Sequence, residues 1–452
     1  MNVLVFNASP KGKFSVTVQT SLFLQAKYKK DTFEFINAGQ KFRKYGRDFT
    51  EVREAIEKAD IIVFSYPVYT FIAPYQLHKF IEIMKAQGID FSDKFATQIT
   101  TSKHFYDVTA HKYIEENCND MNFKFINGLS ADMDDLLTEN GQRQASEFWE
   151  RVRFQVSENI CEKPLAGPKQ VYTKYDRQLT ETIAKSSSKK VTIVTNCEKD
   201  DHDLQNMIED FRTILPYESK VFNIVEHRID GGCLGCFGCV STAKCIYKDG
   251  FDEYLRTEIQ AKSDAIVYAF TIKDHSMGAS FKMYDDRQFC NGHRTVTVGM
   301  PIGYIINGNL DYEANLRFII EGRADVGETP LSYVAYKGDE MKEEIVKLSK
   351  KLSYLLKAEI MPTRNFYGIG GMKIFRDLIF VMKGMMKADH KFYKSHGMYD
   401  FPQKQKSMII KMKLVGALMD LPKADKIMKQ NMNKGILMPY EKLMTTVKPE
   451  ED

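Results

Sequence analysis

The most constraining feature of this 452-residue sequence is a strand pattern that occurs twice. Asp60–Ser65 reads DIIVFS and Asp264–Ala269 reads DAIVYA. Each is an uninterrupted apolar run after an acidic residue, which is typical of a strand buried on both faces of a parallel sheet. The two runs hold the same place in two similar successions of strands and helices. A repeat of domain size indicates duplication rather than a solenoid.

Strands that alternate with helices predict a doubly wound parallel sheet in each copy. In the first copy we expect strands at Val3–Phe6, Thr32–Ile36, Ile61–Ser65, Phe95–Thr100 and Phe123–Asn127. In the second copy we expect them at Val191–Thr195, Lys220–Val225, Asp264–Ala269 and Thr295–Val298. The fold class is therefore α/β, with two such domains in tandem.

Changes in composition predict the domain limits as 1–160, 189–360 and 361–452, with a polar linker over 163–188. The last region is rich in methionine and basic, with 17 Lys and Arg against 9 Asp and Glu from Pro362 onward. We expect it to be helical, with Gly368–Gly371 as a hinge loop. Packing on the protein's own domains is the expected role, and contact with a membrane surface is the alternative.

The charge balance limits the partners. The formal net charge is only +4, which argues against a nucleic-acid binder with a concentrated basic face. The first residues, MNVLVFNASPKG, lack the basic start of a signal peptide, and no apolar run is long enough for a transmembrane helix. We therefore expect a cytoplasmic protein without a transmembrane segment, and a homodimer is left open.

The loop after the first strand has the residues of a phosphate site. It lies between a strand and a helix, where open α/β sheets bind ligands and helix N–H groups attract anions. Hydroxyl and ammonium groups come from Ser9, Lys11, Lys13, Ser15 and Thr17. The alternative is an ordinary strand-to-helix turn with Ser15 as the cap.

This loop resembles the phosphate loop of the flavodoxin-like NAD(P)H-dependent FMN reductases. The resemblance extends to Pro67–Val68–Tyr69–Thr70, which looks like the family's loop after the third strand. It implies that Pro67, Val68, Tyr69 and Thr70 contact the ribityl chain and ring of FMN, with Thr101, Ser102 and His104 on the other side. That third loop lacks the family's usual glycines. Packing of Tyr69 and Phe71 in the core is the alternative.

The second copy resembles the same family with a changed first loop. Asn196–His202 has no serine and carries three acidic residues, which would repel a phosphate. Lys282, Asp286 and Arg287 match the family's Lys-x-x-x-Asp-Arg helix, and Gly299–Gly303 looks like a third loop. We expect a flavodoxin-like fold without FMN phosphate binding. His275 is either a solvated loop histidine or a proton donor.

Four of the eight cysteines form a tight cluster with the spacing C-x₂-C-x₂-C-x₅-C. They are Cys233, Cys236, Cys239 and Cys245. Close spacing and intervening glycines suit a [4Fe–4S] cluster, and the motif resembles that of the iron–sulfur flavoproteins. A zinc site, which usually pairs two separated knuckles, and a cluster without metal are the alternatives.

The resemblance implies an oxidoreductase with FMN and a [4Fe–4S] cluster, and with NAD(P)H or a redox carrier protein as donor. The catalytic residues are not identified. The alternatives are a quinone, nitro or flavin reductase with structural cysteines, and a non-catalytic flavoprotein scaffold. The phosphate loop is intact only in the first copy, and the cysteines occur only in the second. We therefore hypothesise that FMN held by the first copy lies near the cluster held by the second.

Overall fold

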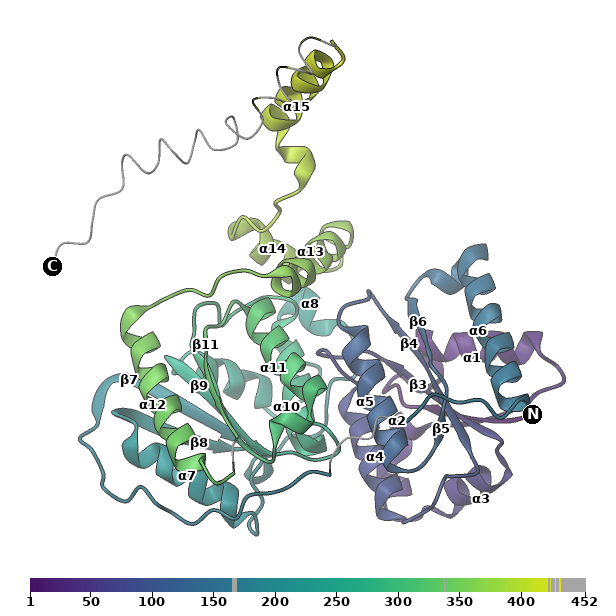
Figure 1. The fold of residues 1–452 in the computed structure, drawn as a ribbon, viewed down its shortest axis with the longest axis horizontal. Helices are drawn as coiled ribbons and strands as arrows, with labels where there is room; N and C mark the ends of the chain where they lie inside the picture. The colour runs from purple at the N-terminus through teal and green to yellow at the C-terminus, as the bar shows by residue number, and fades with distance from the viewer. Residues whose placement is uncertain (165–168, 337, 422, 424–426, 428–430, 432–452) are drawn as a thin grey trace. The chain divides into compact units, whose positions relative to one another are not determined.

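The structure is a computed structural model that describes residues 1–164, 169–336, 338–421, 423, 427 and 431. It consists of two compact units, Met1–Phe392 and Tyr393–Asp452. The first unit contains two α/β halves, each with its own parallel sheet (Figure 1).

The first half has the order β2-β1-β3-β4-β5 in its sheet, with β6 also paired to β4. Its strands are β1 Asn2–Asn7, β2 Thr32–Ile36, β3 Ile61–Pro67, β4 Phe95–Ser102, β5 Lys124–Phe125 and β6 Leu129–Asp132. Its helices are α1 Val16–Lys27, α2 Ala38–Tyr45, α3 Thr50–Lys58, α4 Tyr75–Ala86, α5 Asp107–Asp120 and α6 Glu139–Ser157. This strand order is the flavodoxin-like one.

The second half has the order β11-β10-β9-β7-β8, which is the same topology. Its strands are β7 Ser186–Thr195, β8 Tyr217–Asn223, β9 Ala265–Thr271, β10 Ile302–Asn307 and β11 Leu331–Ala335. Its helices are α7 His202–Ile214, α8 Gly238–Thr242, α9 Phe251–Tyr254, α10 Gly278–Arg287, α11 Ala314–Gly327 and α12 Met341–Ala358. The predicted tandem of doubly wound sheets is confirmed.

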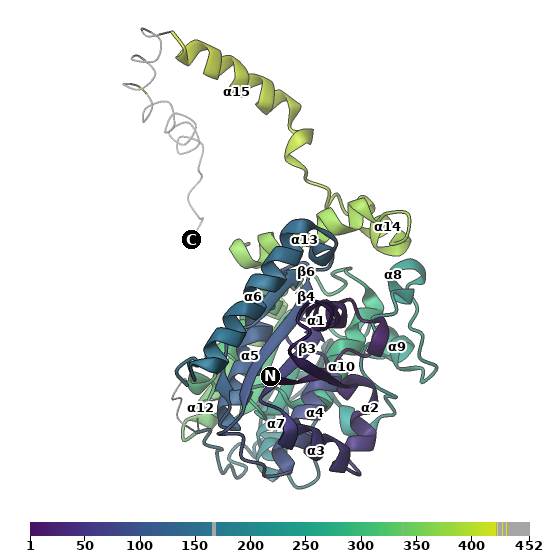
Figure 2. The same cartoon turned by 90° about the vertical axis from the view of Figure 1, so that its right-hand side faces the viewer.

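The two halves stack as layers, with the α4–α5 and α10–α11 helix pairs between the two sheets (Figures 1 and 2). Apolar residues of each sheet alternate between the two faces. In the first half, Val3 and Val5 pack with α1 and α6, whereas Leu4 and Phe6 pack with α4. Central strands such as β3 and β9 are therefore covered on both faces, which explains their unbroken apolar runs in the sequence.

The contact between the halves is nearly two-fold symmetric. Asp286 of α10 accepts a hydrogen bond from the first backbone N–H of α4, that of Tyr75, at 2.8 Å. Glu82 of α4 accepts one from Ala279 N, at the start of α10, also at 2.8 Å. Tyr75 and Ala279 are 204 positions apart, and so are Glu82 and Asp286. Each half therefore caps the equivalent helix of the other, as in an isologous dimer.

The loop after the third strand of each half repeats at the same spacing. Tyr69 and Ile72 exchange backbone hydrogen bonds, and so do Lys273 and Ser276. The two central residues of each turn have positive φ: 45° and 75° at 70–71, and 51° and 60° at 274–275. The duplication is therefore preserved in backbone geometry where the side chains have diverged.

The predicted strand at Thr295–Val298 is wrong. These residues form turns, and the fourth strand of the second half is β10. The segment is held by Asp389, which accepts hydrogen bonds from the His293 backbone at 3.1 Å and from Arg294 at 2.6 Å. Gly299–Gly303 leads into the amino end of β10, so it is not a loop at the carboxyl edge.

The predicted hinge at Gly368–Gly371 is also wrong, because these residues lie in helix α13, Phe366–Val381. A Cβ on Gly368 would meet the Asp325 carbonyl oxygen at 2.7 Å, and one on Gly371 would meet the Phe105 ring at 2.7 Å. The glycines allow α13 to approach its neighbours closely. Helix α14, Lys387–Ser395, follows.

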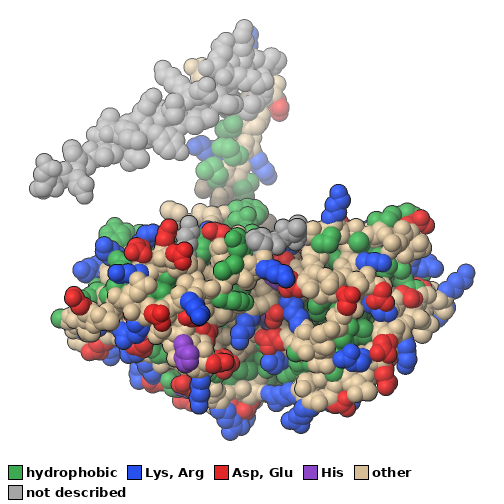
Figure 3. Space-filling model, turned by 60° about the horizontal axis from the view of Figure 1, so that its bottom comes forward, with side chains coloured by type: hydrophobic (Ala, Val, Ile, Leu, Met, Phe, Trp, Pro, Cys, Tyr) green, Lys and Arg blue, Asp and Glu red, His purple; other side chains and the backbone are tan. Residues whose placement is uncertain are grey.

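The linker is more ordered than predicted at its far end, since Ser186 already pairs with Tyr217. Residues 165–168 lie outside the described part. The second unit contains helix α15, Lys406–Met419, and the rest of the predicted extension from 432 onward is not described. Among the described helices, none has both the length and the apolar character needed to cross a bilayer. On the face of the first unit seen in Figure 3, Lys and Arg side chains are interspersed with Asp and Glu.

Candidate functional site

The loop between β1 and α1 leaves its helix N-terminus open to an anion. Ser15 is the N-cap residue of α1, yet its side chain makes no capping hydrogen bond, and the first turn carries no acidic residue. The side chains of Ser9, Ser15 and Thr17 are buried at this edge of the sheet. Because the first N–H groups of a helix have no partner within it, they are free to bind a phosphate.

The other two predicted flavin loops meet this one. Pro67 at the end of β3 pairs with Thr101 at the end of β4. The hydroxyl groups of Thr17 and Thr101 lie 2.5 Å apart, which joins the first loop to the third. Parallel strands thus bring three loops together at the carboxyl edge of the first sheet.

These loops line a cavity of about 430 Å³ in the first unit. Ten of the twelve predicted FMN-contacting residues line it: Ser9, Lys11, Ser15, Thr17, Pro67, Val68, Tyr69, Thr70, Thr101 and Ser102. Lys13 and His104 lie outside the lining. The Lys13 ammonium lies over the Phe14 ring, and His104 Nδ1 is 2.8 Å from Asp107.

The second half and α13 complete the walls. The sequence did not identify these residues as part of a site, and they include Phe289, His293, Arg294, Arg323 and Phe375. Arg323 comes from α11 and Phe375 from α13. In this part of the second half, the sequence singled out only the Lys282–Asp286–Arg287 motif. The residues that follow the motif were missed, because Thr295–Val298 was predicted as a strand.

The cysteine loop of the second half lies against the flavin loops of the first. Cys233 and Cys239 line the same cavity. The Lys11 ammonium is 5.1 Å from the centre of the Phe237 ring, and Gln76 Nε2 donates to the Cys233 carbonyl oxygen at 3.4 Å. A Cβ on Gly235 would lie 2.1 Å from the Tyr69 hydroxyl. The two predicted sites are therefore neighbours within one unit.

The four cysteines differ in exposure. Cys236 is exposed, and Cys233, Cys239 and Cys245 are partly buried. Burial raises the pKa of Cys233, and it raises that of Cys239 to about 11. The Cys233 thiol accepts a hydrogen bond from Gly235 N at 3.3 Å. Because burial favours neutral thiols, a bound cation would be needed to hold them as thiolates.

A fifth cysteine, Cys290, lies close to this loop. It is 2% exposed and follows α10. Cys245 and Cys239 lie near enough to affect the pKa of its thiol. Burial raises the pKa of Cys290 to about 12. Sequence spacing could not identify it, because it lies 45 positions after Cys245.

The sulfur atoms of the cysteine loop are not gathered around a single point. Four thiolates on one zinc ion would lie about 3.8 Å apart, given Zn–S bonds of about 2.3 Å. Among the described residues, one group of three or more candidate ligand atoms lies within 4.8 Å, and it consists of Glu116, His275 and Glu313. No three of the cysteine sulfur atoms lie that close together. A cubane separates its ligand sulfurs more widely, because each binds a different iron atom.

Asp249 and Arg287 brace the cysteine loop. The two terminal nitrogens of Arg287, Nη1 and Nη2, donate to Asp249 at 2.6 and 2.8 Å, and Nη1 also donates to the Gly231 carbonyl oxygen at 3.3 Å. Burial alone would raise the pKa of Asp249, but the bonds from Arg287 outweigh it and lower the pKa to about 2. The pair fixes the chain on either side of the cysteines.

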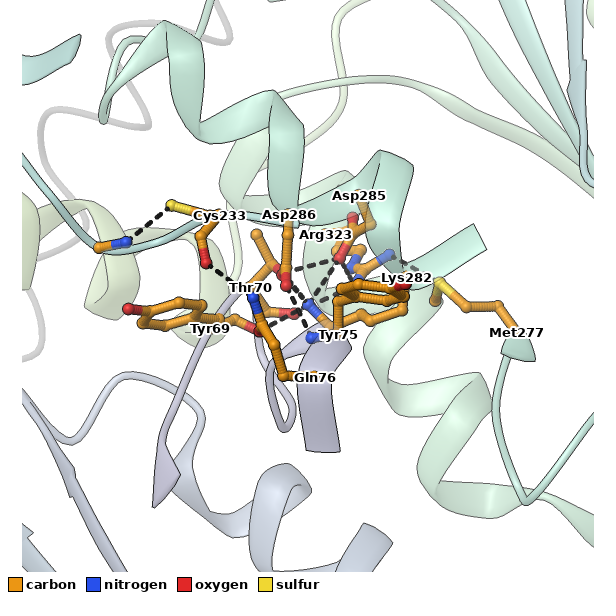
Figure 4. A network of polar contacts seen from close by, with 11 residues as sticks. Tyr69, Thr70, Tyr75, Gln76, Cys233, Met277, Lys282, Asp285, Asp286 and Arg323 are labelled. Atoms are coloured by element: carbon orange, nitrogen blue, oxygen red, sulfur yellow. Dashed lines mark hydrogen bonds and ion pairs between the residues drawn. The ribbon is translucent and has the colours of Figure 1, made fainter. Parts of the chain in front are cut away.

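A buried polar network joins the loop at Pro67–Thr70 of the first half to helices α10 and α11 of the second half (Figure 4). Lys282 is fully buried, and its ammonium lies within hydrogen-bonding distance of the Tyr69 carbonyl oxygen, Thr70, Asp285 and Asp286. Arg323 adds bonds to Asp285 at 2.8 Å and to the Thr70 carbonyl oxygen at 3.0 Å. Burial raises the pKa of Asp286, while Arg323 and Lys282 outweigh burial and hold that of Asp285 low. The loop at Pro67–Thr70 is thus positioned by the other half.

The comparisons agree with this architecture. Residues 1–118 match the model of a family described as having a flavodoxin-like fold. With the repeated strand order, the class is a tandem flavodoxin-like α/β protein. No curated protein matches the sequence.

Solved structures that resemble the chain are distant. An NAD(P)H:quinone oxidoreductase from Methanothermobacter marburgensis is 13% identical, with 36% of this chain and 98% of that chain covered and a TM-score of 0.28. An FMN-dependent NADH-azoreductase from Bacillus anthracis, in complex with FMN, is 17% identical over 33% of this chain and 98% of that chain, with a TM-score of 0.26. General stress protein 14 from Treponema denticola, also with FMN, is 13% identical over 34% and 98%, with a TM-score of 0.27.

Proposed function

We propose that this protein is a flavin-dependent oxidoreductase that binds FMN in the first half and a [4Fe–4S] cluster on the cysteine loop of the second half. One observation carries the proposal: a single cavity is lined both by the flavin loops, including Ser15 and Tyr69, and by Cys233 and Cys239. Two redox groups that exchange electrons must be held close together, and setting that orientation is the protein's task.

The residues have distinct roles in this proposal. Ser9, Ser15 and the first N–H groups of α1 bind the FMN phosphate, and Pro67–Thr70 contact the ribityl chain and ring. Cys233, Cys236, Cys239 and Cys245 hold the cluster. Bound FMN would supply two-electron chemistry and the cluster one-electron chemistry. NAD(P)H or a reduced carrier protein is the donor we propose.

The first test is the content of the anaerobically purified protein. We expect one FMN and four each of iron and sulfide per chain, measured by absorbance and chemical analysis. Flavin without iron would favour the alternative of a quinone, nitro or flavin reductase with structural cysteines. A colourless protein that binds neither flavin nor iron would contradict both the proposed function and the reductase alternative. A scaffold role would then remain.

The second test separates the two redox groups. The double variant Cys236→Ser/Cys239→Ser should retain FMN that its donor reduces, but lose transfer to one-electron acceptors. Cys161→Ser is the matched control, because Cys161 is also partly exposed and lies outside the cavity lining. One-electron transfer at the normal rate in the double variant would contradict the division of labour.

A further inference from the structure

The second half has a counterpart of the predicted flavin site. Its position follows from comparing the strand pairing in the two sheets. Pro67 pairs with Thr101 at the ends of β3 and β4, and Thr271 pairs with Asn307 at the ends of β9 and β10. The first turn of α7 corresponds to that of α1. The loops at Asp203, Ile272 and Asn307 therefore form the second half's equivalent of the three flavin loops.

A segment of the chain's own linker lies on all three of these loops. Tyr175 N donates to Asp203 Oδ1 at 2.7 Å, in the first turn of α7. The Tyr172 hydroxyl donates to the Ile272 carbonyl oxygen at 3.0 Å. Thr173 N donates to Asn307 Oδ1 at 3.2 Å.

A fourth contact extends along the edge. The side-chain amide of Gln170 accepts from Asn309 N at 2.8 Å and donates to the Asn309 carbonyl oxygen at 2.9 Å. Gln170 also donates to Glu313 at 2.8 Å. The linker thus follows the carboxyl edge of the second sheet from the β10 loop toward α7.

The linker is anchored beyond this point by a buried carboxylate. Asp210 of α7 is fully buried and accepts hydrogen bonds from the Tyr175 hydroxyl at 2.8 Å and from Arg177 Nε at 3.2 Å. It also accepts from the backbone N–H groups of Gln178 and Leu179, at 2.7 and 3.1 Å. A buried carboxylate with this many donors holds the segment firmly in place.

We infer that residues 170–175 are the built-in occupant of the second half's ligand site, a peptide strap in the place that FMN takes in the first half. The N-terminus of α7, next to this segment, is unfavourable for binding an anion. Asp201 caps α7 by accepting from Leu204 N at 3.2 Å, and Asp203 adds a negative charge in the first turn. Negative charge at a helix N-terminus repels a phosphate and attracts backbone N–H donors. Each chain therefore has room for one flavin.

Hydrogen exchange of the intact protein tests the strap without relying on flavin. We expect the amides of Thr173 and Tyr175 to exchange slowly. Asn307→Ala should speed exchange at Thr173 by about tenfold, because one hydrogen-bond acceptor is lost. The variant Asp203→Ala, at a second and separate contact, should do the same at Tyr175 and provides the test if Asn307→Ala does not fold.

The matched control is Thr101→Ala, at the position equivalent to Asn307 in the first half. We expect it to weaken FMN binding and leave exchange at Thr173 unchanged, while Asn307→Ala leaves the FMN content at one per chain. Two FMN per chain, or free-peptide exchange at Thr173 and Tyr175 in the unmodified protein, would overturn the inference. Slow exchange without any bound FMN would contradict the proposed function alone.

Discussion

At the scale of single residues, ionisable groups at the contact between the halves carry the most information. His275 lies on the second half, and its two ring nitrogens face Asp120 of the first half at 3.1 Å and Glu313 at 2.9 Å. The sequence left this residue as either a solvated loop histidine or a proton donor. It could not show the ion pairs, because Asp120 is 155 positions away.

The charge of His275 makes stability depend on pH. Burial lowers the pKa of His275, but hydrogen bonds to Asp120 and Glu313 outweigh burial and raise it to about 10. Since the folded pKa exceeds the unfolded value of about 6.5, this stabilisation is complete below pH ~6.5 and is lost as pH rises toward about 10. We expect the free energy of unfolding to fall over that window, and to fall less steeply in His275→Gln.

Urea denaturation at several pH values measures this slope. The neighbouring Glu116 titrates at the lower end of this window, because burial raises its pKa to about 7. Glu116→Gln should therefore be measured in parallel, and exposed His202→Gln serves as the control for the substitution itself. Equal slopes in the unmodified protein and His275→Gln would contradict the prediction.

At the scale of elements, the cysteine loop shows what a motif can predict. Its spacing indicated a metal-binding loop, which stays a prediction, and its glycines indicated tight turns. Gly235 and Phe237 both have φ of 61°, as such turns require. The spacing could not show which surface the loop contacts. That depends on the packing of α10 against α4, which places Gly235 beside Tyr69 and Lys11.

Gly235→Ala should disturb the contact between the cysteine loop and the flavin loop. The new Cβ would meet the Tyr69 hydroxyl, and the positive φ adds strain of about 1 kcal/mol. We expect less iron per chain and slower transfer to one-electron acceptors. Gly250→Ala is the matched control: its φ is 74° but nothing lies within 4 Å of the added Cβ. Equal effects of the two substitutions would indicate strain alone.

Elements that the sequence predicted wrongly have identifiable causes. Thr295–Val298 has the β-branched residues of a strand, but hydrogen bonds from the preceding segment to Asp389 hold it in turns. Gly368–Gly371 has the composition of a hinge, but tight packing selects glycine inside α13. In both cases contacts distant in sequence outweigh local propensity. Strands such as β1 and β3 were predicted correctly because burial on two faces leaves a clear apolar pattern.

At the scale of the whole molecule, the two halves are related by a near two-fold axis. Equivalent residues of the two halves nevertheless contribute differently to stability. Glu82→Ala removes a helix cap and should lower the free energy of unfolding by about 1 kcal/mol. Its twin, Asp286→Ala, also removes a partner of buried Lys282, and we expect a loss of about 3 kcal/mol.

Equilibrium denaturation of both variants provides the measurement. Lys262→Ala is the control, because it breaks an exposed pair with Glu258 and should change stability by less than about 1 kcal/mol. Equal losses for Glu82→Ala and Asp286→Ala would mean that Lys282 adds nothing to the cap.

The reciprocal caps at Glu82 and Asp286 have an evolutionary consequence. In a dimer of identical chains, every substitution appears on both sides of the axis, so the two sites cannot be changed separately. A covalent tandem removes that restriction, because a codon change alters one side only. Lys282 has no lysine twin, since the position 204 residues before it is His78. Selection can therefore tune one site for a ligand while the other half evolves as its support.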